Sequence, residues 1–204
     1  MDNVSLKPRR RPVQSRARLT QQAILDAFVR LLREKSYARL TMRDIAALAG
    51  VGLGTVYEHF PNKRAIAANA IHQRFKAVGT QLLACAAARQ EQPSAQLLDA
   101  VLDRVIELHV SQTQEWSLLI ELERQISGLA AYRSLYAQFI DLWRQILQVA
   151  APFAPDAAAA TVHAAVYGLL YQTLLYQPQT VGTPEFRRQL GKLVHGYLAI
   201  CALP

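Results

Sequence analysis

Hydrophobic residues recur at helical spacing along almost the whole chain, and no segment shows the alternation of a strand. In residues 24–32 the apolar positions follow an i, i+3, i+4, i+7, i+8 stripe, which is typical of one helix face. Further helical periodicity runs through the segments 41–49, 53–60, 61–90, 98–109, 113–125, 129–150, 156–176 and 183–203. The pattern therefore predicts an all-α protein of about nine helices.

Two short helices joined by a tight turn are predicted between Thr41 and Pro61. Thr41 is a residue type that caps a helix N-terminus, and Asp44 three positions on completes a capping box. Gly50 follows the first helix, where a left-handed residue is expected. A second helix, roughly Leu53 to Phe60, then ends before Pro61. This is the helix-turn-helix pattern, whose second helix lies in the DNA major groove.

The second of these helices carries hydrogen-bonding side chains on the face opposite its apolar residues. Val56 and Phe60 are expected to face the core, and basic residues at the start of the next helix are placed to meet phosphates. Leu53 could read only a thymine methyl or the groove shape. The predicted DNA-binding residues are Thr41, Arg43, Leu53, Gly54, Thr55, Tyr57, His59 and Lys63.

The segments ILDAFVRLLREKSY, TMRDIAALAGV and GTVYEHFPNK together resemble the DNA-binding domain of the tetracycline-repressor (TetR) family. The resemblance covers about the first third of the chain. It implies a three-helix DNA-binding domain followed by a larger helical domain that binds an inducer and dimerises. Two positions depart from the family pattern: Gly52 stands where a capping Ser is usual, and Ser36 stands where a Gly is usual.

Charge is distributed unevenly between the two parts of the chain. Residues 1–64 contain 13 Lys and Arg against 5 Asp and Glu, whereas residues 65–204 contain 10 of each. A basic segment joined to a neutral one is expected of a protein that docks one end on a polyanion. The predicted domains are a basic arm (1–14), a helix-turn-helix domain (15–64) and a regulatory and dimerisation domain (65–204). The arm is either a solvated tail or a segment that follows DNA.

Several other classes of function find little support in the sequence. It contains no Walker loop, GxGxxG, HExxH or GxSxG motif, its five histidines form no i, i+4 pair, and Cys85 and Cys201 are far apart. No catalytic residue, metal site or cofactor is predicted. The uncharged segment Ala157–Tyr176 is long enough to span a membrane, but its Ala, Thr, His and Gln content favours a buried interface helix. A polar, basic N-terminus predicts a cytoplasmic protein.

The second domain is expected to contain both a pocket and a dimer interface. Buried Tyr, Trp and His side chains bring polar tips to apolar surroundings, as in small-molecule sites. The predicted pocket residues are His109, Trp116, Tyr132, Trp143, His163, Tyr167 and Tyr171. The predicted interface of a homodimer, on the last two helices, comprises Ala164, Ala165, Gly168, Leu190, Leu193, Val194 and Tyr197.

Three functional hypotheses follow from these observations. The first is a repressor that binds double-stranded DNA at a palindromic operator and is released by a small apolar or aromatic effector. The second is a DNA-binding regulator without an effector, either an activator or a constitutive repressor. The third is an enzyme or transport protein whose resemblance is incidental. Sequence-specific DNA retention separates the first two from the third, and effector-induced release separates the first from the second.

Overall fold

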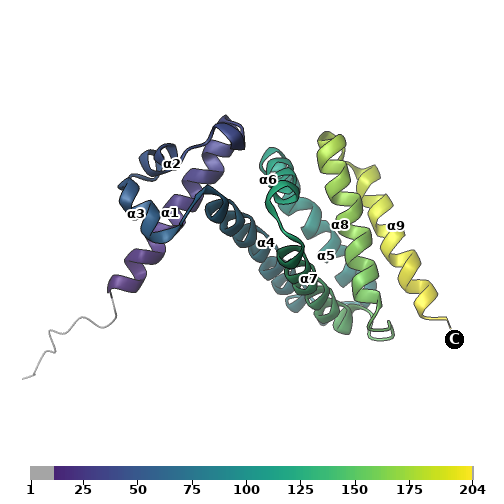
Figure 1. The fold of residues 1–204 in the computed structure, drawn as a ribbon. Helices are drawn as coiled ribbons and strands as arrows, with labels where there is room; N and C mark the ends of the chain where they lie inside the picture. The colour runs from purple at the N-terminus through teal and green to yellow at the C-terminus, as the bar shows by residue number, and fades with distance from the viewer. Residues whose placement is uncertain (1–11, 204) are drawn as a thin grey trace, which may run out of the picture. The chain divides into compact units, whose positions relative to one another are not determined.

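The computed structural model describes residues 12–203, and within this range the chain forms nine α-helices, two short 3-10 helices and no strand (Figure 1). The elements are α1 (Pro12–Glu34), η1 (Tyr37–Arg39), α2 (Met42–Ala49), α3 (Leu53–His59), α4 (Lys63–Ala87), α5 (Ser94–Val110), α6 (Thr113–Ile126), α7 (Leu129–Ala150), α8 (Ala158–Tyr176), η2 (Pro178–Thr180) and α9 (Pro184–Cys201). The all-α prediction is confirmed. Most of the predicted basic arm lies outside the described residues.

The chain divides into two compact units between Ala70 and Ile71. This division falls inside α4, whereas the sequence placed the domain boundary after residue 64. The reason is that α4 is one uninterrupted helix, whose first turns belong to the first unit and whose remainder belongs to the second. Periodicity alone could not show where its packing partners change.

The first unit is held together by one apolar core. Ile24, Phe28, Ile45, Val56 and Ile66 come from α1, α2, α3 and α4, and each is fully buried. With eight and seven residues, α2 and α3 are too short to be stable alone. Their stability therefore depends on this shared core.

The turn between α2 and α3 has the local geometry predicted from the sequence. The Thr41 side chain accepts a hydrogen bond from the Asp44 backbone N–H at 3.1 Å, and the Thr41 backbone N–H donates to the Asp44 carboxylate at 3.0 Å. Gly50 adopts the left-handed conformation with φ of 68°. Because a side chain is disfavoured at that φ, glycine here allows the sharp change of direction.

α4 begins two residues later than predicted. Asn62 precedes the helix, and its side-chain oxygen accepts a hydrogen bond from the Ala65 backbone N–H at 2.9 Å. Asn62 is thus the capping residue, and Pro61 lies before the helix rather than in its first turn.

The Lys63 side chain fastens the η1 turn to the start of α4. Its ammonium donates to the backbone oxygens of Tyr37 and Leu40, each at 2.7 Å, and lies 4.4 Å from the centroid of the Tyr37 ring. Lys63 therefore satisfies two carbonyl groups at the end of a short helix. The pKa of the Tyr37 hydroxyl is raised by burial, and the positive charge of Arg64 offsets part of this rise.

In the second unit, α8 packs against α6, α7 and α9, and α5 packs against α6, α7 and α9 (Figure 1). The largest fully buried side chain is that of Trp143 on α7. A 2.9 Å ion pair joins Arg74 on α4 to the buried Glu115 on α6. On the surface, Asp103 pairs with Arg187 and Asp99 with His195, which link α5 to α9.

Across residues 12–203, none of the helices combines the length and hydropathy required to cross a bilayer. α8 instead places apolar side chains such as Val166, Leu170 and Leu174 inside the second unit.

Replacing Lys63 with Met is expected to lower the free energy of unfolding by about 2 kcal/mol, because two carbonyl groups lose a charged donor. Urea unfolding followed by circular dichroism measures this change. Lys76→Met, an exposed position on the same helix, is the matched control and should leave stability nearly unchanged. Equal stability of the two variants would contradict the role given to Lys63.

His109 is expected to make the protein less stable in acid. It is fully buried, its Nδ1–H donates to the Val105 oxygen, and burial lowers its pKa to about 4. The unfolded chain therefore takes up a proton first as the pH falls below about 6.5, and the stability due to this group is lost between there and pH 4.

As the pH falls from 7.5 to 5, the titration of His109 should lower the free energy of unfolding by about 2 kcal/mol. His109→Phe removes this titration, so its unfolding free energy should change less with pH than that of the wild type. Exposed His72→Gln is the control and should retain the wild-type dependence. Parallel pH profiles for wild type and His109→Phe would refute the assignment.

Candidate functional site

The first candidate site is the outer surface of the helix-turn-helix formed by α2 and α3. Arg43 lies exposed in the first turn of α2, beside the capping pair Thr41 and Asp44. The pKa of Asp44 is lowered, first by its hydrogen bonds from Thr41 and then by Lys35, whose ammonium lies 3.3 Å from the carboxylate. This carboxylate is therefore charged, and it already binds Thr41 and Lys35. Arg43 thus remains exposed without pairing to Asp44.

The buried and exposed residues of α3 lie on opposite faces, as the sequence predicted. Val56 is fully buried, and Phe60 just after the helix is 2% exposed. Tyr57 is 52% exposed, and Gly54 also lies on the outer face. The absence of a side chain at Gly54 leaves open space next to the helix backbone, so another molecule can approach closely there.

Three further predicted residues are only partly accessible. Leu53, Thr55 and His59 are half-buried, and the His59 ring lies 6.4 Å from that of Phe60. Their accessible atoms lie on the same short helix as Tyr57. Glu58 is also exposed on α3, a position that the sequence analysis did not single out.

Lys63 does not have the role predicted from the sequence. Its ammonium is engaged by two backbone oxygens inside the domain, so we do not retain it as a phosphate contact. The sequence could not indicate this, because the acceptors, Tyr37 and Leu40, lie more than twenty residues earlier. One exposed cation that the sequence did not indicate is Arg39, in the η1 turn before Thr41.

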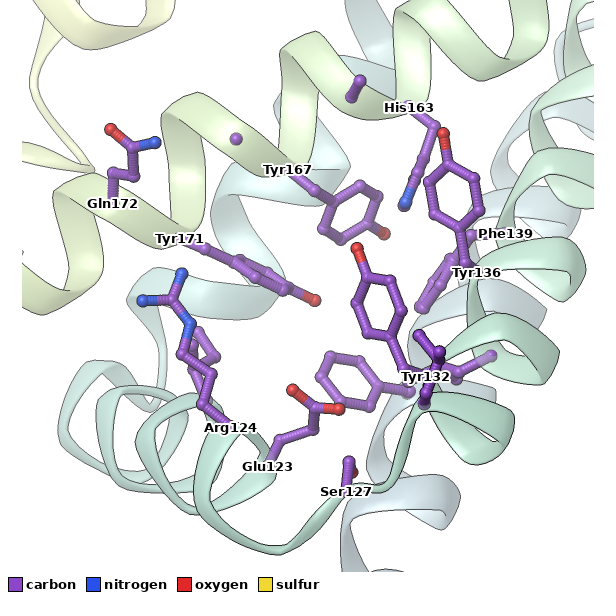
Figure 2. A pocket seen from close by; sticks show the side chains of 16 residues that line it. Glu123, Arg124, Ser127, Tyr132, Tyr136, Phe139, His163, Tyr167, Tyr171 and Gln172 are labelled. Atoms are coloured by element: carbon purple, nitrogen blue, oxygen red, sulfur yellow. The ribbon is translucent and has the colours of Figure 1, made fainter.

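The second candidate site is a pocket of about 710 Å³ in the second unit (Figure 2). Its volume is in the range of small-molecule sites. The floor is buried and the rim, near the end of α6 and the start of α7, is exposed. The lining residues come from α4, α6, α7 and α8 and the α6–α7 connection: Phe75, Ile120, Glu123, Arg124, Ser127, Leu129, Tyr132, Leu135, Tyr136, Phe139, His163, Ala164, Tyr167, Gly168, Tyr171 and Gln172.

Four of the predicted pocket residues line this cavity. Tyr132 comes from the first turns of α7, while His163, Tyr167 and Tyr171 follow one another at four-residue intervals on α8. Residues at this interval share a helix face, so α8 presents three polar aromatic tips to the same space. Figure 2 shows the Tyr132, Tyr167 and Tyr171 hydroxyls directed into the cavity.

The other three predicted pocket residues belong to the core behind it. Trp143 is fully buried and does not line the cavity. The Trp116 indole N–H donates to the Leu108 oxygen at 3.0 Å, and the His109 ring lies 4.4 Å from the Trp116 ring. These side chains are corrected to core residues. Their spacing predicted burial but could not distinguish a cavity wall from the layer behind it.

Burial keeps the polar groups of the pocket floor uncharged. It lowers the pKa of His163 to about 4, raises that of Tyr167 well above its ordinary value, and is also the main cause of the raised pKa of Tyr171. The charge of Glu123 raises the pKa of Tyr171 further. At neutral pH the floor therefore offers a neutral imidazole and two neutral hydroxyls.

The aromatic rings of the floor pack closely on one another. The ring of His163 lies 5.2 Å from Phe139, 5.1 Å from Tyr136 and 4.7 Å from Tyr167. Tyr136 and Phe139 were not singled out as pocket residues. A signal for Tyr136 was present in the helical spacing of Tyr132 and Tyr136, whereas nothing in the sequence pointed to Glu123 or Arg124.

The predicted dimer residues do not form one surface. Leu190 and Val194 are 0% and 1% exposed within a single chain, so they are core residues and this part of the prediction is wrong. Ala164 and Gly168 line the pocket. The remaining members, Ala165, Leu193 and Tyr197, are accessible, and Leu193 is 46% exposed.

Within residues 12–203, no group of three or more His, Cys, Asp or Glu side chains is arranged to hold a metal ion. The two cysteines are unpaired thiols, and Cys85 donates to the Ala100 oxygen at 3.5 Å. The two sites above are thus the principal candidates in the described chain.

Comparison with known proteins connects the first unit to a family of regulators. Residues 24–70 match the family described as bacterial regulatory proteins, tetR family. The chain is 40% identical over 58 residues to the HTH-type transcriptional regulator CymR of Pseudomonas putida. That alignment covers 28% of this chain and 29% of CymR, so it spans less than a third of the length of that relative.

Solved structures match over nearly the whole fold. A TetR-family transcriptional regulator from Mesorhizobium loti superposes with a TM-score of 0.69 at 18% identity, covering 91% of this chain and 98% of that one. SmeT, the repressor of the Stenotrophomonas maltophilia multidrug efflux pump SmeDEF, superposes with a TM-score of 0.63 at 22% identity, covering 88% of each chain. The first unit therefore contains a domain of the tetR family of bacterial regulatory proteins, and the chain as a whole has the fold of solved TetR-family regulators.

Proposed function

We propose that this protein is a sequence-specific transcriptional repressor that binds a palindromic operator as a homodimer and is released by a small apolar or aromatic effector. The main support for the DNA-binding part of this proposal is the outer face of α3. Tyr57 and Gly54 are exposed there, while Val56 holds the opposite face in the core. A short helix fixed in this way can enter the major groove with its polar side chains towards the bases.

Exposed basic residues lie on the two elements that precede this helix in the first unit. Arg39 and Arg43 are exposed on η1 and α2, and neither has a carboxylate partner among the ion pairs of residues 15–203. Phosphate contacts from such residues position a protein on DNA without reading the sequence. We therefore assign Arg39 and Arg43 to the DNA backbone, and Leu53, Thr55 and Tyr57 to the bases.

The pocket supports the effector part of the proposal. A regulator without an effector has no need for a cavity of about 710 Å³ with polar tips in its floor. Phe75 of the pocket wall and Lys63 of the first unit belong to the same continuous helix, α4. A ligand that prefers one position of Phe75 therefore acts on a helix that extends into the DNA-binding unit.

The energy required for release is small. An effector must bind the released arrangement more tightly than the DNA-bound one, since equal affinity would shift nothing. A tenfold loss of operator affinity corresponds to about 1.4 kcal/mol of coupling. The functional test is selection of bound DNA from a random pool, followed by a search for compounds that release the recovered operator. Failure to select any sequence would refute the proposal.

Arg43→Ala is expected to weaken binding to all DNA sequences by a similar factor, because a phosphate contact carries no base information. The slope of log affinity against log salt concentration should fall by about one. Fluorescence anisotropy over a salt series measures both effects. Arg133→Ala removes an exposed charge from α7 and is the control. An unchanged slope for Arg43→Ala would rule out the phosphate contact.

Leu193→Arg is expected to give monomers with much weaker operator binding, because it places a charge on the exposed apolar side of α9, near Tyr197 and Ile200. Light scattering coupled to gel filtration reports the mass. Ala199→Arg adds the same charge to an exposed position on another side of α9 and should leave the dimer intact. A wild-type protein that binds its operator as a monomer would overturn the dimer proposal.

A further inference from the structure

The pocket floor contains polar atoms that nothing in the described chain satisfies. The hydroxyls of Tyr167 and Tyr171 and Nδ1 of His163 are buried without a hydrogen-bond partner among residues 15–203. All three residues line the pocket. Buried polar groups in native proteins are almost always hydrogen-bonded, and exceptions indicate a missing partner. The three groups lie close together, with ring centroids 4.7 Å apart for His163 and Tyr167 and 5.0 Å apart for Tyr167 and Tyr171.

The chemistry of these atoms restricts the group that could satisfy them. The tyrosine hydroxyls are neutral at physiological pH and can donate a hydrogen bond to an oxygen. Burial lowers the pKa of His163 to about 4, so protonating its imidazole to balance an anion costs free energy. A carboxylate placed here would lose its hydration, and its only counter-charge in the pocket floor would require protonation of this buried imidazole, which is unfavourable.

The charged groups of the lining lead to the same conclusion. Only Glu123 and Arg124 among the lining residues carry charge, and both come from the end of α6. The Glu123 carboxylate is close enough to disfavour negative charge at the Tyr171 hydroxyl. Arg124 is exposed, so its charge is largely screened by solvent.

The walls around the polar atoms favour a flat ring. Phe75 and Phe139 lie 5.7 Å apart with perpendicular rings, and Tyr136 packs edge-on to His163. Offset and edge-to-face contacts of this kind are the arrangements that aromatic rings prefer. A bound aromatic ligand would extend the same packing.

We propose that the effector is an uncharged phenol, whose ring lies among the aromatic side chains and whose hydroxyl bonds to Tyr167, Tyr171 and His163. A phenol oxygen accepts from a tyrosine hydroxyl while its proton is donated to the imidazole nitrogen, so one group satisfies both kinds of partner. This inference rests on the proposed effector function and specifies the ligand class of that site.

The test uses the full-length protein and three probes with the same ring system: 2-naphthol, naphthalene and 2-naphthoate. Isothermal titration calorimetry at neutral pH should show the tightest binding for 2-naphthol. Naphthalene should bind about tenfold more weakly because it lacks the hydrogen-bonding group. 2-Naphthoate should bind at least about a hundredfold more weakly because its charge must be desolvated.

Tyr167→Phe and Tyr171→Phe should each weaken 2-naphthol binding by about tenfold and leave naphthalene binding unchanged. The control is Tyr176→Phe on the same helix, whose side chain is 83% exposed and does not line the pocket. Because each change removes only a hydroxyl, melting temperatures near that of the wild type would exclude misfolding as the cause.

Three results would overturn the inference: 2-naphthoate binding as tightly as 2-naphthol, equal binding of naphthalene and 2-naphthol, or no binding of any probe up to its solubility limit. Release of the selected operator by 2-naphthol is measured separately. If the predicted affinity order and tyrosine effects hold but the operator is retained, the ligand class stands and the proposed effector control fails.

Discussion

The burial of one uncharged helix, α8, determines both the core and the pocket of the second unit. Val166, Leu170 and Leu174 are removed from water by neighbouring helices, which is the main favourable contribution to packing here. The same burial encloses His163 and Tyr167, and it opposes any charge on either group. A neutral polar floor is thus a direct consequence of placing this helix inside the bundle.

The first unit depends on a different arrangement, in which local capping and a small core support one another. The capping box at Thr41 and the left-handed Gly50 define where α2 begins and ends. Neither feature would hold so short a helix in place without the buried Ile45 and Val56. Lys63 adds a long-range constraint, because its hydrogen bonds to the Tyr37 and Leu40 oxygens fix the η1 turn. This turn directly precedes α2, so the contact stabilises the α2–α3 surface.

α4 is the element common to both proposals. It contributes Ile66 to the core of the first unit and Phe75 to the pocket wall of the second. The buried Glu115 holds Arg74, next to Phe75, by a 2.9 Å ion pair. Removing one partner of such a pair leaves a poorly solvated charge, so this part of α4 resists independent movement. The proposed effector control depends on α4 moving as a segment.

The sequence by itself determined the helix content, the capping box at Thr41, the turn at Gly50 and the burial of Val56, because these depend on residues close together in the chain. It also indicated that the second domain would hold buried polar aromatic groups. Tertiary structure decided which of them meet a cavity: Tyr167 lines it, whereas Trp143 lies in the core. It likewise assigned Lys63 to distant carbonyl groups and Leu190 to the interior. Helical periodicity shows which face of a helix is buried, but only the packed structure shows what covers that face.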